Sequence, residues 1–326
     1  MNILIISHQY YPVLGGVPVV ARLLANGFLQ LNANIRLVTA TPAKDEEKES
    51  FDVYRRPHPL ILLKLFKWAD QIVMLGPSVR SGWPVFLTRK PCVISHQAGV
   101  PVGGFQKALM EKSTNIACSN YLADAIGGNA IGVGNPFDSL TFNYDESIKK
   151  DRDFIFVGRL EKDKGADILL RALADLRERR KPIRASIVGA GSSEHSLKQL
   201  SVELGVDDMV DFTGPLHCAE LRTMIQRHYI GIVPSRWQEP FGIVALELIA
   251  CGLPVIAASV GGLPEAVGPC GLLFTNEKHQ ELSHLMEKLY LDRGLQRDLI
   301  ANAEKHLEKS KPINVAKSYL RVLAEN

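Results

Sequence analysis

The chain has 326 residues, of which 46% are hydrophobic and 22% are charged, the composition of a soluble globular protein. A chain of this length is too long for one ordinary hydrophobic core and fits two domains of about 150 residues each. The formal net charge of +3 does not by itself favour nucleic acid, and we expect no nucleic-acid partner.

The cysteines and the apolar runs exclude further classes of protein. Five cysteines form an odd set without a C-x-x-C pair, so neither a disulfide framework nor a zinc site is indicated, and a reducing cytoplasm is the simple inference. Residues 1–7 lack a basic leader and turn polar after five apolar residues, so we expect a first strand and not a signal peptide. No apolar run approaches the ~20 residues of a membrane span.

The first half alternates strands and helices. Strands are predicted at residues 3–7, 35–39, 71–75, 92–95 and 115–118, with a helix at 18–31. Gly15 and Gly16 follow the first strand, where missing side chains let backbone amides approach a phosphate, although a plain turn explains an isolated Gly-Gly pair better. His96 ends the fourth strand, where a lone histidine is more often a structural hydrogen-bonder than a catalytic group.

A polar stretch at residues 135–153 is the predicted linker, and the strand–helix alternation then starts again. Strands are predicted at 154–158, 185–188, 210–212, 230–234 and 255–257. This order favours two doubly wound parallel sheets facing across a cleft, with ligands at the carboxyl ends of the strands. The only D-x-D triplet, residues 151–153, lies in the linker, and we interpret it as a solvated charge run and not as a metal site.

The most informative segment is residues 234–247, because it places two carboxylates on either side of a helix start. Glu239 comes just before the predicted helix and Glu247 about two turns into it. The free amides of Phe241, Gly242 and Ile243 would point outward at the helix N-terminus, which favours a phosphate. Since carboxylates accept hydrogen bonds from sugar hydroxyls, the combination indicates a nucleotide-sugar.

This segment resembles the signature of glycosyltransferase family 4, whose members are retaining enzymes of the GT-B fold with an E-P-F-G-x-x-x-x-E pattern. Four further motifs fall in the family's order: Phe156 to Leu160 with Lys164-Gly165, Ile187 to Gly191, Phe212 to Gly214, and Gly252 to Glu265. They cover the second half of the chain densely and the first half more thinly. The resemblance therefore implies two Rossmann-like α/β domains.

The same resemblance implies the domain limits and the site. Residues 1–138 would form the acceptor-side domain, with the C-terminal helix 313–326 packing back on it, and residues 139–312 the nucleotide-sugar domain. Catalytic roles would fall to His96, Arg159, Lys164 and Glu239. Donor binding would involve Gly15, Gly16, Gly158, Leu216, Phe241, Gly242, Ile243 and Glu247.

In these roles, Arg159 and Lys164 would hold the leaving diphosphate, so that no metal and no other cofactor is expected. Glu239 would bind hydroxyls of the donor sugar, Glu247 those of the ribose, and Leu216 would lie near the base. His96 would lie close to the donor sugar and the acceptor.

The implied function is retaining transfer of a hexose or N-acetylhexosamine to a hydroxyl of a sugar or lipid-linked sugar, in surface polysaccharide, lipopolysaccharide or glycolipid synthesis. A UDP-sugar donor is favoured by family frequency only. The alternatives are a non-catalytic sugar-nucleotide binding module and a sugar-nucleotide epimerase of the same fold. We expect a cytoplasmic protein. Two interpretations fit the stretch 60–68, with Lys64 and Lys67 in an apolar run: peripheral contact with the inner face of the cell membrane, or a buried helix.

Overall fold

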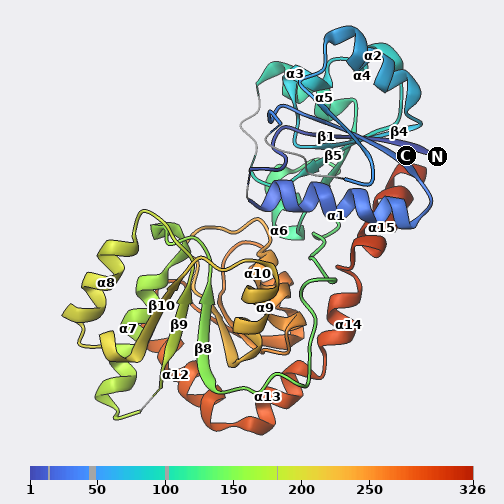
Figure 1. Ribbon diagram of the computed structural model, residues 1–326. Helices are drawn as coiled ribbons and strands as arrows, with labels where there is room; N and C mark the ends of the chain where they lie inside the picture. Colours follow the sequence, from blue (N-terminus) through green and yellow to red (C-terminus); the bar gives the residue numbers. More distant parts are fainter. Residues whose placement is uncertain (14, 44–48, 100–102, 182, 326) are drawn as a thin grey trace. The chain divides into compact units, whose positions relative to one another are not determined.

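The structure, a computed structural model, describes residues 1–13, 15–43, 49–99, 103–181 and 183–325. Asn326, which the predicted last helix includes, lies outside them. The chain divides into two compact units. The first comprises Met1–Phe137 and Lys309–Asn326, and the second comprises Asp138–Glu308 (Figure 1).

The first unit is built on a parallel sheet of seven strands among the described residues, in the order β3-β2-β1-β4-β5-β6-β7. The bounds of its strands are β1 Asn2–Ser7, β2 Asn34–Thr39, β3 Asp52–Arg55, β4 Gln71–Leu75, β5 Cys92–His96, β6 Thr114–Ala117 and β7 Ile131–Gly132. Its helices are α1 Gly16–Gln30, α2 Pro59–Trp68, α3 Val79–Gly82, α4 Val85–Thr88, α5 Gly104–Glu111, α6 Asn120–Ile126 and α15 Pro312–Ala324.

The second unit contains a parallel sheet of six strands in its described part, in the order β10-β9-β8-β11-β12-β13. Its strands are β8 Arg152–Val157, β9 Ala185–Val188, β10 Val210–Gly214, β11 His228–Val233, β12 Val255–Ala258 and β13 Gly271–Phe274. Its α-helices are α7 Ala166–Glu178, α8 Glu194–Glu203, α9 Cys218–Gln226, α10 Ile243–Ala250, α11 Leu263–Val267, α12 His279–Leu291, α13 Arg293–Ile300 and α14 Ala303–Glu308. Short 3₁₀ turns lie at Lys162–Lys164, Asp207–Met209 and Gly268–Cys270.

The predicted α/β class with two parallel sheets is confirmed, and burial explains why it could be predicted. The central strand β1 is an unbroken apolar run in which Ile3, Leu4 and Ile5 are fully buried. Parallel sheets are covered on both faces by helices, so their central strands read as continuous apolar segments. The short strand β3, whose residues are at most half-buried, was not predicted because its sequence Asp-Val-Tyr-Arg lacks such a run.

The last helix, α15, belongs to the first unit although it is distant in sequence. It lies beside α1 (Figure 1). The rings of Phe28 and Tyr319 meet edge to face with centroids 6.4 Å apart, and the Tyr319 hydroxyl lies 2.6 Å from Ser95 Oγ at the end of β5. These contacts are buried, so α15 completes the core of the first unit.

Candidate functional site

The candidate site of the second unit lies at the point where the strand order of its sheet reverses. Strand β8 pairs with β9 on one side and with β11 on the other, so the segments that follow β8 and β11 leave the same edge in adjacent positions. Crevices at such switch points bind ligands in open α/β sheets. Arg159 and Lys164 follow β8, and Glu239 follows β11.

Lys164 and Glu239, 75 residues apart in sequence, form an ion pair in this place. Lys164 Nζ lies 2.5 Å from Glu239 Oε1, with side chains 20% and 14% exposed. The same oxygen accepts a hydrogen bond of 2.9 Å from the buried Ser235 hydroxyl. Within the described residues the structure gives Glu239 Oε2 no partner, so one carboxylate oxygen is held by the protein and the other is available to a ligand.

Close backbone packing holds the two segments together. Gly165 has a φ of +69°, and a Cβ there would lie 2.0 Å from the Pro234 carbonyl oxygen, so only glycine fits directly after Lys164. The Asp163 carbonyl also accepts hydrogen bonds from the amides of Arg236 at 2.9 Å and Trp237 at 3.2 Å. These contacts therefore hold the loop that carries Lys164 against the loop that carries Glu239.

Arg159 lies at the outer side of this cluster. Its guanidinium is 3.8 Å from Asp163 Oδ2, which is also 3.7 Å from Lys164 Nζ. The Arg159 side chain is 69% exposed, so most of its donors face solvent. One carboxylate thus bridges the two predicted diphosphate cations without covering either of them.

Helix α10 begins at Ile243, after Gly242 in a left-handed conformation. The structure gives the amides of Phe241, Gly242 and Ile243 no backbone acceptor within the described residues, as expected at a helix N-terminus. Glu247 is the fifth residue of α10, just over one turn past its start. The predicted turn at Pro240-Phe241-Gly242 and the helix start at Ile243 are confirmed, but the distance of about two turns is wrong, because the four residues from Ile243 to Glu247 make little more than one turn.

The carboxyl of Glu247 is partly buried, and no described residue hydrogen-bonds to it. Burial, with a smaller contribution from the Asp138 carboxylate, raises the pKa of Glu247 to about 7. A carboxylate without hydrogen-bond donors in a desolvated place is typical of a group that meets its partner only in a complex.

Two other predicted donor residues belong to the same unit. Gly158 directly follows β8, and its amide donates to the Val188 carbonyl at the end of β9 at 3.0 Å. Leu216 follows β10 and is partly buried. Both lie at the carboxyl edge of the sheet, on the side of the strands from which Arg159 and Lys164 also emerge.

His96 belongs to the first unit, where it ends β5 and is fully buried. Its Nε2 lies 2.9 Å from Asn115 Oδ1, and the Asn115 amide donates to the carbonyls of Met110 and Ser113 at 2.9 and 3.1 Å. Since those two carbonyls fix the amide orientation, the hydrogen-bond network assigns the proton of His96 to Nε2.

The other ring nitrogen, Nδ1, is buried and has no partner among the described residues. Burial lowers the pKa of His96, which keeps the ring neutral and Nδ1 unprotonated near neutral pH. The side chain thus presents a hydrogen-bond acceptor held in a defined orientation.

In the first unit, Gly15 directly precedes α1 and Gly16 is the first residue of α1. A Cβ at Gly16 would meet no atom within 4 Å, so packing inside the described chain does not require glycine there. Leu14, which precedes the pair, is outside the described residues.

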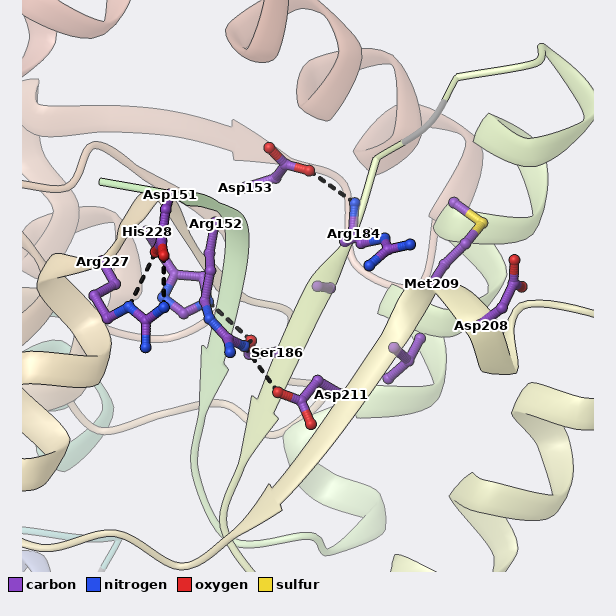
Figure 2. Close-up of a pocket in the computed structure, with 12 residues that line it drawn as sticks. Asp151, Arg152, Asp153, Arg184, Ser186, Asp208, Met209, Asp211, Arg227 and His228 are labelled. Carbon is purple, nitrogen blue, oxygen red and sulfur yellow. Dashed lines mark hydrogen bonds and ion pairs between the residues drawn. The ribbon is translucent and has the colours of Figure 1, made fainter. Parts of the chain in front are cut away.

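A separate pocket of about 390 Å³ lies at the opposite, amino edge of the second sheet. Figure 2 shows its charged side chains pairing with one another. The pairs are Asp151 with Arg227, Arg152 with Asp211, and Asp153 with the amide of Arg184. The paired side chains remain partly exposed, as the interpretation of residues 151–153 as a solvated charge run requires, and they also tie the starts of neighbouring strands together.

Sequence reasoning missed three residues that contact predicted site residues: Asp163 and Ser235, beside Lys164 and Glu239, and Asn115, beside His96. No motif marks them, although Asp163 and Ser235 each lie within four residues of a partner, and Asn115 lies 19 residues from His96. Among the described residues, no three His, Cys, Asp or Glu side chains are grouped so that they could hold a metal ion. The described helices also include none that is both long and apolar enough to cross a membrane.

The sequence comparisons with known proteins match mainly the second unit. Residues 141–306 match the profile of the family Glycosyl transferases group 1. D-inositol 3-phosphate glycosyltransferase from Corynebacterium aurimucosum is 44% identical over 145 residues, or 42% of this chain and 34% of that protein. The Arthrobacter sp. protein of the same name is 37% identical over 160 residues, or 47% and 38%. The matched part thus spans little more than a third of these relatives.

Solved structures resemble the chain over its whole length. A glycosyltransferase from Rickettsia africae has a TM-score of 0.81 at 16% identity and covers 99% of this chain and 98% of that one. Anabaena HepE in complex with UDP-glucose has a TM-score of 0.79 at 21% identity, with full coverage of both chains. At such identities the likeness establishes the shared fold of these glycosyltransferases.

Proposed function

The chain belongs to the group 1 glycosyl transferases, and from this premise we propose that it transfers a sugar from a nucleotide-diphosphate donor to a hydroxyl acceptor with retention of configuration. The observation that carries the proposal is the Lys164–Glu239 ion pair at the switch point of the second sheet, beside the open amides at the start of α10. It joins a phosphate-binding cation to a hydroxyl-binding carboxylate.

Arg159 and Lys164 bind the diphosphate part of the donor. As the glycosidic bond breaks, negative charge grows on the leaving phosphate, and the fixed charges of Arg159 and Lys164 stabilise it more in the transition state than in the ground state. The amides of residues 241–243 add donors with the favourable end of a helix dipole. This set neutralises the leaving group with protein residues, and we propose that transfer does not depend on a metal.

The two glutamates divide the rest of the donor between them. Glu239 Oε2 accepts a hydrogen bond from a hydroxyl of the transferred sugar, while Glu247 accepts from the ribose. Gly158 and Leu216 line the remainder of the nucleotide site. In the first unit, the free Nδ1 of His96 accepts a hydrogen bond from a substrate hydroxyl, and Gly15 and Gly16 leave backbone room for a phosphate.

Retention follows from a front-face reaction, in which the acceptor oxygen attacks from the side of the leaving phosphate and gives its proton to a phosphate oxygen. The bond from the anomeric carbon to the phosphate oxygen breaks as the bond to the acceptor oxygen forms. A UDP-sugar is the proposed donor, supported by the UDP and UDP-glucose in the HepE structures. The acceptor is a sugar or lipid-linked sugar of a surface polysaccharide, lipopolysaccharide or glycolipid.

The test is a melting-temperature screen with UDP, GDP and ADP and their sugars, followed by product analysis. A ligand at a hundred times its dissociation constant stabilises the folded state by roughly 2.7 kcal/mol, which is readily seen. The expected result is stabilisation by one nucleotide series and retained-anomer transfer to an added acceptor, with D-inositol 3-phosphate among those tried. Binding without transfer or hydrolysis would favour the non-catalytic module, and an altered sugar without acceptor the epimerase.

The location of the protein is proposed to be the cytoplasm, with peripheral contact to anionic membrane. Helix α2 buries Leu62, Leu65 and Phe66 in the core of the first unit. Its outer side exposes Leu60 at 66% and Ile61 at 44%. Adjacent α4 exposes Leu87 at 66%. Exposed Lys64 and Lys67 flank these side chains, and apolar groups framed by lysines suit an anionic lipid surface.

Cosedimentation with vesicles tests the contact. A double Leu60→Gln, Leu87→Gln variant should lose most binding to vesicles containing phosphatidylserine, and the native protein should bind phosphatidylcholine vesicles weakly. Val202→Gln is the matched control, since Val202 is an exposed apolar residue of the second unit. Equal binding of the double variant and the control would contradict the contact.

A further inference from the structure

A second cavity of the second unit lies away from the candidate donor site and has a volume of about 890 Å³. Lys150 lies just ahead of β8, Tyr229 is the second residue of β11, and Pro254 immediately precedes β12. The cavity is thus at the amino edge of the sheet, whereas Lys164 and Glu239 follow the carboxyl ends of the strands. Its volume is that of a small-molecule site.

Three cations line this cavity, and no described carboxylate forms an ion pair with them. Lys150 Nζ donates to the Gly252 carbonyl at 2.8 Å. Arg293 lies 3.6 Å above the centre of the Tyr229 ring and donates to Gln296 Oε1 at 3.0 Å. Arg297, four residues further along α13, lies on the same face of that helix. Positive charge therefore gathers at this cavity without an ion pair among the described residues, and the Asp153 carboxylate is the described group that interacts with Arg293 electrostatically from a distance.

Lys150 is affected first by its burial and then by this neighbouring positive charge. Burial and the nearby Arg293 guanidinium lower the pKa of the Lys150 ammonium to about 8. An anion beside this ammonium would restore its charge and remove part of the repulsion. Glu304, the acidic residue of the lining, is exposed and lies beyond ion-pair distance of the three cations.

The rest of the lining is largely apolar. It includes Ile249, Pro254, Ile300 and Leu307, together with the half-exposed ring of Tyr144. A purely inorganic anion would leave these surfaces in contact with water, whereas a ligand with an apolar or aromatic part would cover them. The charged and the apolar parts of the lining therefore fit a ligand that has both an anionic group and an apolar group.

We propose that this cavity binds a phosphate monoester whose organic part is apolar or aromatic, with Lys150, Arg293 and Arg297 on the phosphate. Arginine pairs are suited to phosphate because the planar guanidinium donates two parallel hydrogen bonds. The site is separate from the proposed transfer reaction, and its occupation does not depend on that proposal.

Calorimetry at pH 8 with phenyl phosphate, inorganic phosphate and phenol tests the site. Phenyl phosphate should bind at least about tenfold more tightly than inorganic phosphate, and phenol should not bind measurably. Lys150→Gln and Arg293→Gln should each weaken phenyl phosphate about tenfold or more, the usual loss of a charged hydrogen bond. Lys149→Gln, which removes an exposed neighbouring charge, is the matched control and should bind as the native protein does.

Proton linkage provides a second measurement. Because an anion restores the charge of Lys150, binding at pH 8 should take up protons, seen as an enthalpy that varies with the ionisation enthalpy of the buffer, and Lys150→Gln should abolish this uptake. An Arg159→Ala, Lys164→Ala variant should retain phenyl phosphate binding. Binding that is lost in this variant but unchanged in Lys150→Gln and Arg293→Gln would overturn the proposal, as would equal affinity for inorganic phosphate.

Discussion

Replacing Glu247 by Gln should make the protein more stable and its nucleotide binding weaker. The folded state raises the pKa of this carboxyl from 4.5 to about 7, so ionisation of Glu247 opposes folding. Because the shift is upward, the stabilising contribution of the protonated carboxyl is complete below pH 4.5. It is lost as the pH rises through 7.

The pKa values set the size of this effect. The interval from 4.5 to about 7 corresponds to about 3 kcal/mol as an upper bound. Partial exposure of the carboxyl brings the expected gain of Glu247→Gln to about 1–3 kcal/mol at pH 8, with almost none at pH 4.5. Glutamine keeps the shape and removes the charge, so packing should be little changed.

Two measurements check this reasoning. Urea denaturation at pH 4.5 and pH 8 should give an increased free energy of unfolding for Glu247→Gln at the higher pH only, and the exposed Glu178→Gln should give no change at either pH. Calorimetry with the bare nucleotide at pH 8 should show affinity reduced about tenfold or more, since glutamine accepts ribose hydrogen bonds less strongly than a carboxylate. A variant without a stability gain at pH 8 would refute the burial argument, and unchanged nucleotide affinity would refute the ribose assignment.

Four further expectations concern the charged and buried groups. Arg159→Ala or Lys164→Ala should reduce turnover by roughly a hundredfold or more with the fold intact by circular dichroism, and a near-native rate would exclude the diphosphate role. Glu239→Gln should keep bare nucleotide affinity within a few fold and lose most transfer, as read by calorimetry beside a transfer assay. Transfer should continue in the presence of EDTA. If EDTA abolished the activity and magnesium or manganese restored it, the electrostatic account would be contradicted. Burial lowers the pKa of His228 to about 4, so the native protein should lose up to about 3 kcal/mol as the pH falls from 6.5 to 4, and urea titrations of His228→Gln should lack that contribution.

The effects of Glu247 and His228 have opposite signs over an overlapping pH range. Rising pH removes stability through Glu247 and adds it through His228, whose ring donates from Nδ1 to the Met224 carbonyl and accepts at Nε2 from Ser186. In the native protein the two contributions therefore largely cancel, and the free energy of unfolding should vary little with pH over this range. Each variant should expose the slope of the residue that remains.

The parts of the fold that the sequence predicted are those whose residues carry a local signal. The central strands β1, β4, β8 and β9 are apolar runs, and each was predicted within two residues of its observed bounds. The short edge strands β3, β7 and β13 were not predicted, because pairing with a neighbour defines them more than their own residues do. The start of α10 at Ile243 was also predicted, because the proline and glycine of the segment 240–242 signal a turn just ahead of it.

The candidate site divides in the same way. Arg159, Lys164, Glu239 and Glu247 could be named from motifs, and the structure brings the first three together at one switch point. The groups that hold these residues in place are invisible to motif reasoning. Asp163 braces the loop through its carbonyl as much as through its carboxylate, which no side-chain pattern records.

The Lys164–Glu239 ion pair changes how the two roles must be understood, because the cation and the carboxylate are not independent. A phosphate competes with Glu239 Oε1 for the Lys164 ammonium, and Asp163, 3.7 Å away, provides a second carboxylate that faces this ammonium. A bare nucleotide that draws Lys164 away leaves the partly buried Glu239 without its cation. A sugar nucleotide repairs that loss, since its hydroxyls donate to the freed oxygen. The ion pair therefore favours the sugar nucleotide over the bare nucleotide, and removing the charge of Glu239 should abolish that preference and not the affinity for the diphosphate.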